Sequence, residues 1–376
     1  METLSERQRI PRLTPLAAVL ERAAALVRPV EPHGVSTDLA RGLVLARDVM
    51  LRAAWPAHAV ALRDGWAVRS SDLGDASAYA PVQFQEAPRF VETGDRLPHG
   101  TDAVLPPDAV NVTGPVAEAL ANAAPGEGVL ARGAAAEAHA PLRRNGDRLR
   151  EVDVALLRAA SIERVSVREP RVLIVTAADI AETRDVVGSF VERAVQDAGA
   201  RARSEGTQAK EERLAQLLTD KTAEAIIVIG GTGEGPRDVS VRTLARVGRV
   251  EVHGIALRPG ETAALGAVGA RPVLLLPGRL DAALSVWLTV GTRLLARLTA
   301  STETPRSRTA TLARKVSSTI GLAEVVPVAA CDGGVEPLAS GHFPLQALAR
   351  AEGWILVPPE SEGYPAGASV EVLPFP

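Results

Sequence analysis

The hydrophobic pattern of the first fifty residues is helical. Apolar side chains recur at helical spacing directly after Thr14 and Pro15, and threonine followed by proline is typical of a helix start. The spacing predicts an amphipathic helix from Thr14 to Arg28 and a second helical stretch from Ser36 to about Leu51.

Between Ala53 and Gly128 the pattern changes to short β-like runs separated by proline and glycine. The clearest runs are Val82 to Phe84 and Ala103 to Leu105. This piece is predicted to be a small β-rich domain, and the apolar spacing from Glu151 to Ala160 predicts a helix after it.

From Arg171 onward, buried-strand runs alternate with helical stretches. The predicted strands are Val172 to Val175, Ala225 to Ile229 and Val273 to Leu276, and the predicted helices are Ser189 to Ala198, Val239 to Val247 and Asp281 to Leu298. Such alternation favours a parallel sheet covered on both faces, with ligands at the carboxyl ends of the strands. The turns after the three strands should therefore open on the same edge.

A stretch rich in serine, threonine and proline, Ser301 to Arg308, is typical of a linker. Beyond it, strand-like runs from Gly353 to Pro358 and from Gly367 to Phe375 predict a small C-terminal β domain. The fold class is therefore a multidomain chain of the α/β plus β type.

Composition excludes several classes of protein. A net charge of only -3 over 376 residues provides no broad basic field for nucleic acid or an anionic membrane. No apolar run approaches the ~20 residues that span a bilayer, and METLSERQRIPR lacks the apolar core of a signal peptide, so we expect a cytoplasmic protein. Cys331 is the only cysteine, which excludes an internal disulfide and a multi-cysteine metal site.

The glycine-rich run from Gly230 to Gly235, GGTGEG, is the sharpest local signal for a ligand. A glycine-rich turn after a buried strand lets backbone N–H groups approach an anion at the next helix N-terminus, which suits a phosphate. The alternative is a tight strand-to-helix turn in which the glycines only satisfy backbone angles. No dinucleotide or Walker motif fits, because the glycine spacing differs and no Lys-Ser or Lys-Thr pair follows.

Two aspartates follow the first two strands of this region. Asp179 and Asp238 should face the same sheet edge, where two carboxylates could hold Mg²⁺ against a phosphate. The alternative is that each aspartate only caps the start of a helix, and position along the chain does not decide between the two.

Three stretches together resemble the MoeA / gephyrin E-domain family of molybdenum-cofactor biosynthesis across nearly the whole chain. They are ALRDGWAV at Ala61 to Val68, ETGDRLPHGTDAV at Glu92 to Val104, and the segment from Arg171 to Leu298. The second is the most specific of the three.

The resemblance implies an architecture of four domains. These are a helical linker domain (residues 1–50 and 129–170), an inserted β-rich domain (51–128), a MogA-like α/β molybdopterin-binding domain (171–302) and a C-terminal β domain (303–376). It also implies a homodimer in which Asp64 and Thr93 complete the partner chain's site. Family members take adenylylated molybdopterin and molybdate, hydrolyse the adenylate and release molybdenum cofactor.

The resemblance also carries residue roles over to this chain. Asp64, Asp179 and Asp238 match the family's catalytic aspartates, and the last two are the candidate Mg²⁺ ligands. The positions expected to bind molybdopterin or molybdenum cofactor are Thr93, Gly94, Thr176, Gly230, Gly231, Thr232, Gly233, Arg258, Pro259, Gly260, Pro277, Gly278 and Arg279.

Several polar groups of the family are absent, which marks this chain as a divergent member. The glutamate of the family's GDEL falls at Ile180, and the two lysines of its KPGKP fall at Arg258 and Glu261. Its RRxGED acidic pair falls at the alanines 134 and 135, and its LPGNP asparagine falls at Arg279. A positioned acid or base contributes roughly 10²- to 10⁴-fold in rate, so these losses argue against molybdate capture and ordinary metal insertion.

Three hypotheses follow. The first is an active molybdopterin molybdotransferase, and the second is a non-catalytic carrier or chaperone that protects or delivers finished cofactor. A MogA-type adenylyltransferase or a molybdenum enzyme would be the protein partner of either. The third, outside the family, is a generic phosphate-binding interaction protein, which leaves the match at Glu92 to Val104 unexplained.

Overall fold

The computed structural model describes residues 8–177, 186–207 and 210–376 and divides the chain into two compact units. One unit combines the chain up to Arg47 with Asn145–Ala155 and Ile162–Pro376. The other consists of Asp48–Arg144 and Leu156–Ser161. The multidomain α/β plus β architecture predicted from the sequence is confirmed.

The first unit is built on a mixed sheet with the strand order β16-β15-β17-β21-β20-β18 among the described residues. The first four strands are parallel, and β20 and β18 are antiparallel additions that the sequence pattern did not predict. The strands are β15 (Arg171–Thr176), β16 (Arg201–Gly206), β17 (Ala225–Ile229), β18 (Arg249–His253), β20 (Ala264–Val268) and β21 (Arg271–Leu276).

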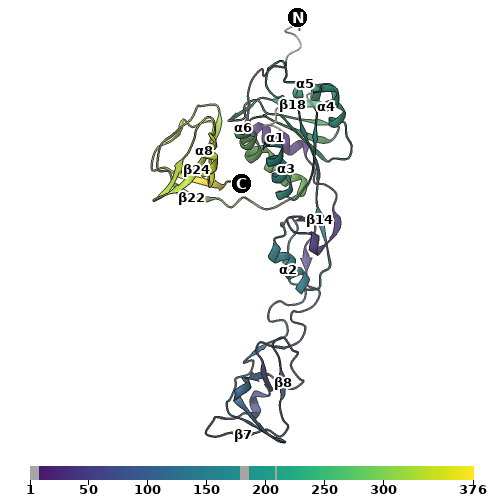
Figure 1. Cartoon of the computed structure of the whole chain (residues 1–376), viewed down its shortest axis with the longest axis vertical. Helices are drawn as coiled ribbons and strands as arrows, with labels where there is room; N and C mark the ends of the chain where they lie inside the picture. The colour runs from purple at the N-terminus through teal and green to yellow at the C-terminus, as the bar shows by residue number, and fades with distance from the viewer. Residues whose placement is uncertain (1–7, 178–185, 208–209) are drawn as a thin grey trace. The chain divides into compact units, whose positions relative to one another are not determined.

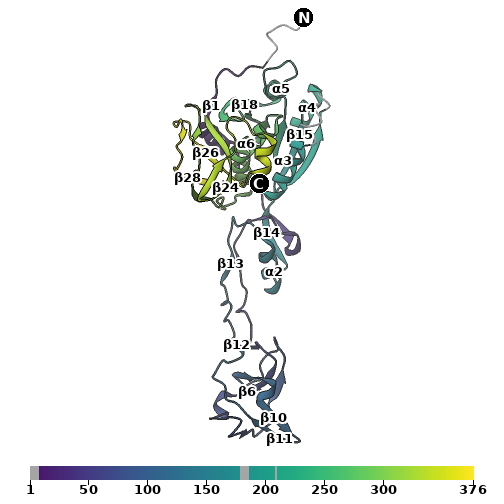
Figure 2. The ribbon, with the colours of Figure 1, turned by 60° about the vertical axis from the view of Figure 1, so that its left-hand side comes forward.

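Helices cover both faces of this sheet, as predicted (Figures 1 and 2). One hydrophobic core joins the sheet to α1, α3, α6 and α7, and a second core on the opposite face joins it to α4 and α5. The helices are α1 (Leu16–Leu26), α3 (Gly188–Asp197), α4 (Glu211–Leu218), α5 (Ser240–Val247), α6 (Leu280–Val286) and α7 (Thr292–Thr299).

The predicted long helix from Asp281 to Leu298 is present but interrupted. A π-helical segment, Trp287–Gly291, joins α6 to α7. A Cβ atom at position 291 would lie 2.5 Å from Cε3 of Trp287, so the wider turn brings the indole against a backbone position that only glycine can fill.

The predicted helix from Ser36 to Leu51 is wrong. This stretch forms β2 (His33–Ser36), a 3₁₀ turn (Thr37–Leu39), β3 (Val44–Leu45) and β4 (Val49–Met50). Gly42 takes a φ of 78° and breaks the helical path, and β2 and β3 instead pair with β14 (Arg164–Arg168), more than a hundred residues later. The predicted helix at Glu151 is confirmed as α2 (Glu151–Ala159).

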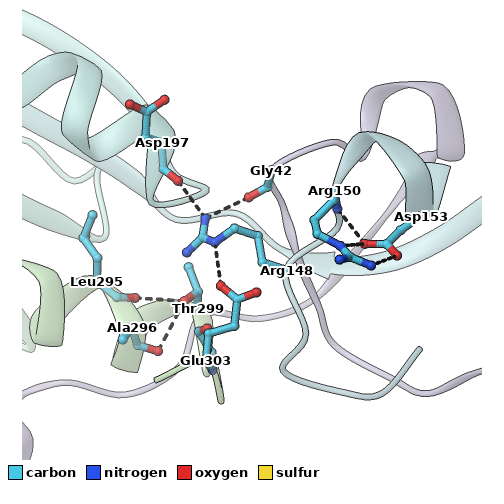
Figure 3. A network of polar contacts seen from close by, with 10 residues as sticks. Gly42, Arg148, Arg150, Asp153, Asp197, Leu295, Ala296, Thr299 and Glu303 are labelled. Atoms are coloured by element: carbon cyan, nitrogen blue, oxygen red, sulfur yellow. Dashed lines mark hydrogen bonds and ion pairs between the residues drawn. The ribbon is translucent and has the colours of Figure 1, made fainter. Parts of the chain in front are cut away.

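Arg148 ties together segments that lie far apart in the sequence (Figure 3). Its Nη1 donates to the carbonyl oxygens of Gly42 and Asp197, both at 2.9 Å, and its Nε donates to Oε2 of Glu303 at 3.2 Å. The guanidinium therefore holds the turn before β3, the end of α3 and the start of the C-terminal linker in one arrangement.

The C-terminal part of the first unit is a β domain, as predicted, with α8 (Leu345–Arg350) beside it. Its main sheet has the order β1-β19-β24-β26-β28-β22, with β25 paired to β24, so β1 and β19 join it to the preceding segments. The strands are β1 (Thr14–Pro15), β19 (Ile255–Arg258), β22 (Arg308–Thr311), β23 (Val316–Ser317), β24 (Ala323–Cys331), β25 (Gly334–Pro337), β26 (Gly353–Val357), β27 (Gly363–Tyr364) and β28 (Ser369–Pro374).

The second unit contains the stretch from Ala53 to Gly128 that was predicted to be β-rich, and it extends further, to Arg144 and to Leu156–Ser161. Its core gathers Val68, Leu73, Leu105 and neighbouring alanines beneath short strands and two 3₁₀ turns, Ser70–Asp72 and Pro107–Ala109. The strands are β5 (Val60–Ala61), β6 (Gly65–Val68), β7 (Val82–Gln83), β8 (Arg89–Val91), β9 (Ala103–Leu105), β10 (Val110–Thr113), β11 (Val116–Ala119), β12 (Val129–Leu130) and β13 (Pro141–Arg143). In the described part of the chain, no helix has the length and apolarity needed to cross a membrane.

Candidate functional site

The carboxyl ends of β15, β17 and β21 form one edge, as the sequence predicted. The N–H of Ala177 donates to the carbonyl of Ile229, and the N–H of Gly230 donates to the carbonyl of Leu276, both at 2.9 Å. The turns after these three strands therefore open side by side.

The backbone of the turn after β17 requires its first two glycines. Gly230 and Gly231 have φ values of 87° and 68°, which side chains rarely adopt. Oγ of Ser240 donates to the carbonyl of Gly230 at 2.8 Å, and a Cβ atom on Gly231 would lie 2.5 Å from that hydroxyl. Part of the glycine requirement is thus conformational, as the alternative interpretation held.

The same turn also presents a row of backbone donors. Among the described residues, the N–H groups of Gly231, Thr232, Gly233 and Glu234 donate to no protein acceptor. Consecutive unpaired N–H groups in a glycine-rich turn form a concave site that favours an anion. The turn therefore combines backbone angles that glycine adopts without strain with a donor set suited to a phosphate.

Two amides at the start of α5 already have a protein acceptor. The amides of Val241 and Arg242 donate to Oε1 of Gln8, at 3.1 and 3.3 Å. A side chain from the N-terminal segment therefore occupies this part of the helix start, and the N–H groups that remain for a ligand are mainly those of the turn.

Asp238 stabilises the turn from within. Its Oδ2 accepts the N–H of Gly235 at 2.9 Å, an amide that precedes the helix. The capping interpretation is wrong for Asp238, because the N-cap of α5 is Val239, whose side chain makes no capping hydrogen bond. Asp179 and Ile180 lie outside the described residues, so the pairing of the two aspartates stays a prediction. No cluster of three or more acidic, histidine or cysteine side chains suited to a metal occurs within residues 8–177, 186–207 and 210–376.

Arg258 is occupied by an acidic neighbour. Its Nε donates to Oε1 of Glu261 at 3.2 Å, and Oε2 of Glu261 accepts the N–H of Gly260 at 3.0 Å. The peptide bond before Pro259 is cis, and Gly260 has a φ of 136°. The loop retains the Pro259–Gly260 pair that matches the family. Arg258, which was expected to bind an anionic ligand, instead forms an ion pair with Glu261 of the same chain.

Arg279 is also paired. It follows Pro277 and Gly278, precedes α6, and donates to both carboxylate oxygens of Asp281, at 3.2 and 2.6 Å. Asp281 is buried and also accepts the N–H of Phe343 at 3.2 Å. The arginine therefore neutralises a buried carboxylate while most of its own side chain stays exposed, and its contact with a ligand stays a prediction.

Two threonines predicted to bind the cofactor are buried. Oγ1 of Thr232 lies 3.0 Å from Oγ1 of Thr262, and the carbonyl of Thr232 lies 3.0 Å from Nε2 of His253. Thr176 ends β15, and its carbonyl accepts the N–H of Thr207 at 3.1 Å. The Thr232 hydroxyl therefore has a protein partner, and a contact between this hydroxyl and a ligand stays a prediction.

In the second unit, the structure brings together Asp64, Thr93 and Gly94. Oδ1 of Asp64 accepts the backbone N–H of Thr93 at 2.7 Å and its hydroxyl at 2.9 Å. Gly94 has a φ of 92° and donates its N–H to Ala61 at 2.8 Å. The backbone and side-chain hydrogen bonds from Thr93 lower the pKa of Asp64, so the carboxylate is ionised at neutral pH.

We expect Thr93→Val to raise the pKa of Asp64 toward its ordinary value of 3.8, because the hydroxyl donor is lost while the backbone donor stays. A carbon-detected NMR titration of the Asp64 carboxyl measures this shift directly. The stabilisation by ionised Asp64 is present above the ordinary aspartate pKa and is lost as the pH falls through the lower folded value, so wild type and variant should converge in acid. An Asp64 pKa that is the same in the variant and the wild type would contradict the conclusion that the Thr93 hydroxyl lowers this pKa.

Sequence reasoning missed Gln8, Ser240 and Asp281 at this edge of the sheet. Asp281 carried a local signal, since an acidic residue in the first turn of a helix is favoured there. Gln8 carried none, because its partners lie more than two hundred residues away.

Comparison with known families covers most of the chain. Residues 14–161 match the MoeA N-terminal region (domain I and II), residues 171–297 match a probable molybdopterin binding domain, and residues 309–375 match the MoeA C-terminal region (domain IV). These matches cover all three stretches that carried the resemblance.

Individual relatives agree over nearly their whole length. A Methanocaldococcus jannaschii protein named for molybdopterin biosynthesis is 25% identical over 362 residues, covering 88% of each chain. Molybdopterin molybdenumtransferase 1 of Mycobacterium tuberculosis is 27% identical and covers 93% of this chain and 96% of its own. The crystal structure of a MoeA protein from Pyrococcus horikoshii superposes with a TM-score of 0.77 at 24% identity, covering 97% of this chain and all of that one, and so shows the same fold.

Proposed function

Because this chain belongs to the MoeA family of molybdenum-cofactor biosynthesis proteins, we propose that it binds molybdopterin or its adenylylated form at the turn Gly230–Gly235. The observation that carries the proposal is the row of four backbone N–H groups without a protein acceptor, from Gly231 to Glu234. Backbone donors held in place before the ligand arrives bind an anion without a further ordering cost. The hypothesis of a generic phosphate-binding interaction protein is disfavoured, because it does not account for the match to the MoeA family.

The experiment that tests this proposal is a fluorescence titration of the purified protein with molybdopterin. Saturable binding of one pterin per chain supports the proposal. Displacement of the pterin by inorganic phosphate would show that the phosphate group of molybdopterin contacts the protein. Absence of binding to both molybdopterin and its adenylylated form would refute it.

A second candidate function is the carrier, which binds cofactor without inserting molybdenum. It is favoured by two ion pairs, because Arg258 and Arg279, the arginines at two of the matched family positions, are each held by a carboxylate. Molybdate is an oxyanion and needs cationic or N–H donors, which Glu261 repels or occupies. The transferase named in the relatives and the carrier are separated by measuring molybdate-dependent release of AMP.

Magnesium fits the described residues only in part. Mg²⁺ is usually held by one or two carboxylates together with substrate phosphates. One carboxylate oxygen of Asp238 accepts a hydrogen bond from the N–H of Gly235. Its other carboxylate oxygen and the phosphate of the ligand would hold the Mg²⁺ ion. When bound, the metal would supply positive charge to the phosphate.

We also propose that the protein is a homodimer in which Asp64 and Thr93 of one chain serve the glycine-rich turn of the other, as the family resemblance implies. A MogA-type adenylyltransferase would supply the adenylylated ligand, and a molybdenum enzyme would receive the product. Light scattering that shows a monomer at micromolar concentration, with and without ligand, would refute the dimer.

Sharing of the site between chains predicts complementation of two inactive variants. Asp64→Ala and Gly233→Asp homodimers are each expected to lose ligand binding. After the two are unfolded and refolded together, about a quarter of wild-type sites should return, since half of the dimers are mixed and each mixed dimer has one intact site. Recovery is measured by stoichiometric pterin titration; a mixture that stays inactive while mixed dimers form would show that each site is built within one chain.

A further inference from the structure

Gln8 is a side chain of the N-terminal segment that is buried against the glycine-rich turn, with 8% of its surface exposed. Its Nε2 donates to the carbonyls of Gly231 at 3.0 Å and Gly233 at 2.5 Å, and its Oε1 accepts the amides of Val241 and Arg242. A primary amide has two N–H donors and two acceptor lone pairs, so all of its capacity is used. Only one orientation of the carboxamide satisfies all four bonds.

These bonds set the direction of two peptide groups in the turn. In a planar trans peptide, the carbonyl of one residue and the N–H of the next point in opposite directions. When Gln8 holds the carbonyls of Gly231 and Gly233, the N–H groups of Thr232 and Glu234 are directed away from Gln8. Both of these N–H groups belong to the unpaired donor row.

The two carbonyls depend on Gln8 to different degrees. The carbonyl of Gly231 also accepts the N–H of Ser240 at 3.0 Å, whereas Gln8 is the one partner of the Gly233 carbonyl among the described residues. Rotation of the Gly233–Glu234 peptide changes ψ of Gly233, which has no Cβ to resist the change, so this peptide gains the most from the restraint. Restraint of the donors in the binding orientation lowers the cost of ordering them when an anion arrives.

The segment that carries Gln8 is itself held at further points. The N–H of Ile10 donates to Oε1 of Glu234 at 2.8 Å, and the N–H of Thr14 donates to the carbonyl of Gly254 at 2.9 Å, where β1 joins β19. Gln8 is therefore presented to the turn by a fixed piece of chain.

We propose that Gln8 is a positioning residue for phosphate binding: it occupies the amides of Val241 and Arg242, directs the N–H of Glu234 toward the anion, and together with the Ser240 amide directs that of Thr232. The inference rests on the proposed function for the identity of the ligand. Gln8 acts through the turn and is not itself expected to touch the ligand.

The test compares two ligands on three proteins. Gln8→Met keeps the length of the side chain and removes all four hydrogen bonds, and Gln196→Met, at an exposed position on α3, is the matched control. We expect Gln8→Met to weaken binding of molybdopterin about tenfold, the effect of losing roughly one well-placed hydrogen bond to a charged group. Binding of the same pterin without its phosphate should be equal in all three proteins, whereas general damage to the fold would weaken both ligands.

A second measurement uses only the wild-type protein and inorganic phosphate. In an NMR titration, the amide signals of Thr232 and Glu234 should move, and those of Val241, Arg242 and the Gln8 carboxamide should stay. Movement of the Val241 and Arg242 amides, or release of the Gln8 carboxamide, would overturn the proposal by showing that phosphate takes the place of Gln8.

The two proposals fail in different ways. Equal molybdopterin affinity in wild type and Gln8→Met would reject the role of Gln8 and leave the function standing. No pterin binding in wild type, with phosphate still moving only Thr232 and Glu234, would reject the function and support Gln8. No response to either ligand would reject both.

Discussion

Gly233→Asp is expected to abolish binding of molybdopterin, with a loss of affinity of at least about 100-fold, because it places a carboxylate inside the donor row that would meet the phosphate. Gly233 is the suitable position for this test. Its φ lies outside the left-handed region, and the atoms that a Cβ at this position would meet belong to the side chain of Asp238, the closest at 2.8 Å. At either glycine a neighbouring side chain must shift, Asp238 at position 233 and Ser240 at position 231, but Gly231 also has a φ of 68°, so a side chain there would strain the backbone as well.

The matched control is Gly233→Asn, which has nearly the same shape and no charge. It should weaken binding far less than Gly233→Asp, and both variants should unfold at similar urea concentrations. Isothermal titration at low and high salt separates the charge effect, since repulsion by an exposed carboxylate is screened at high salt. Equal losses in the two variants would show that space, and not phosphate charge, governs binding at this turn.

The second large effect is expected in metal insertion. Supplied with adenylylated molybdopterin, Mg²⁺ and molybdate, the wild-type protein should release AMP at least about 100-fold more slowly than the mycobacterial molybdenumtransferase 1 assayed beside it. The reason is the ion pair of Arg258 with Glu261, which places a negative charge where a molybdate oxyanion would need a positive one.

Glu261→Lys should raise the molybdate-dependent rate at least about tenfold, because it removes the repulsion and adds a cation. Glu261→Gln is the matched control, since it can still accept the N–H of Gly260 and leaves Arg258 without a charged partner. Its rate should lie between those of wild type and Glu261→Lys. Ordinary AMP release by the wild-type protein would refute the carrier and establish the transferase.

Helices and strands whose buried residues form one continuous run or recur at one regular spacing were predictable from the sequence. The strands Ala225–Ile229 and Ala103–Leu105 were predicted to the residue, because each is a short apolar run bounded by turn residues. The stretch after Ser36 was misread as a helix, because its apolar residues are buried by pairing with β14, and that partner is distant in sequence. Local period cannot reveal a strand whose neighbour lies far along the chain.

The sequence by itself determined the alternation of strands and helices, the common edge of the three turns, and the glycine-rich turn at that edge. These features depend on backbone angles and apolar spacing, which neighbouring residues encode. Only the tertiary structure decided which polar groups remain for a ligand: Gln8 caps α5, Glu261 holds Arg258, and Asp281 holds Arg279. The physical reason is that a charged or hydrogen-bonding group near a site takes whatever partner the folded chain brings within about 3 Å. For Gln8 that partner was set by a fold-back of more than two hundred residues.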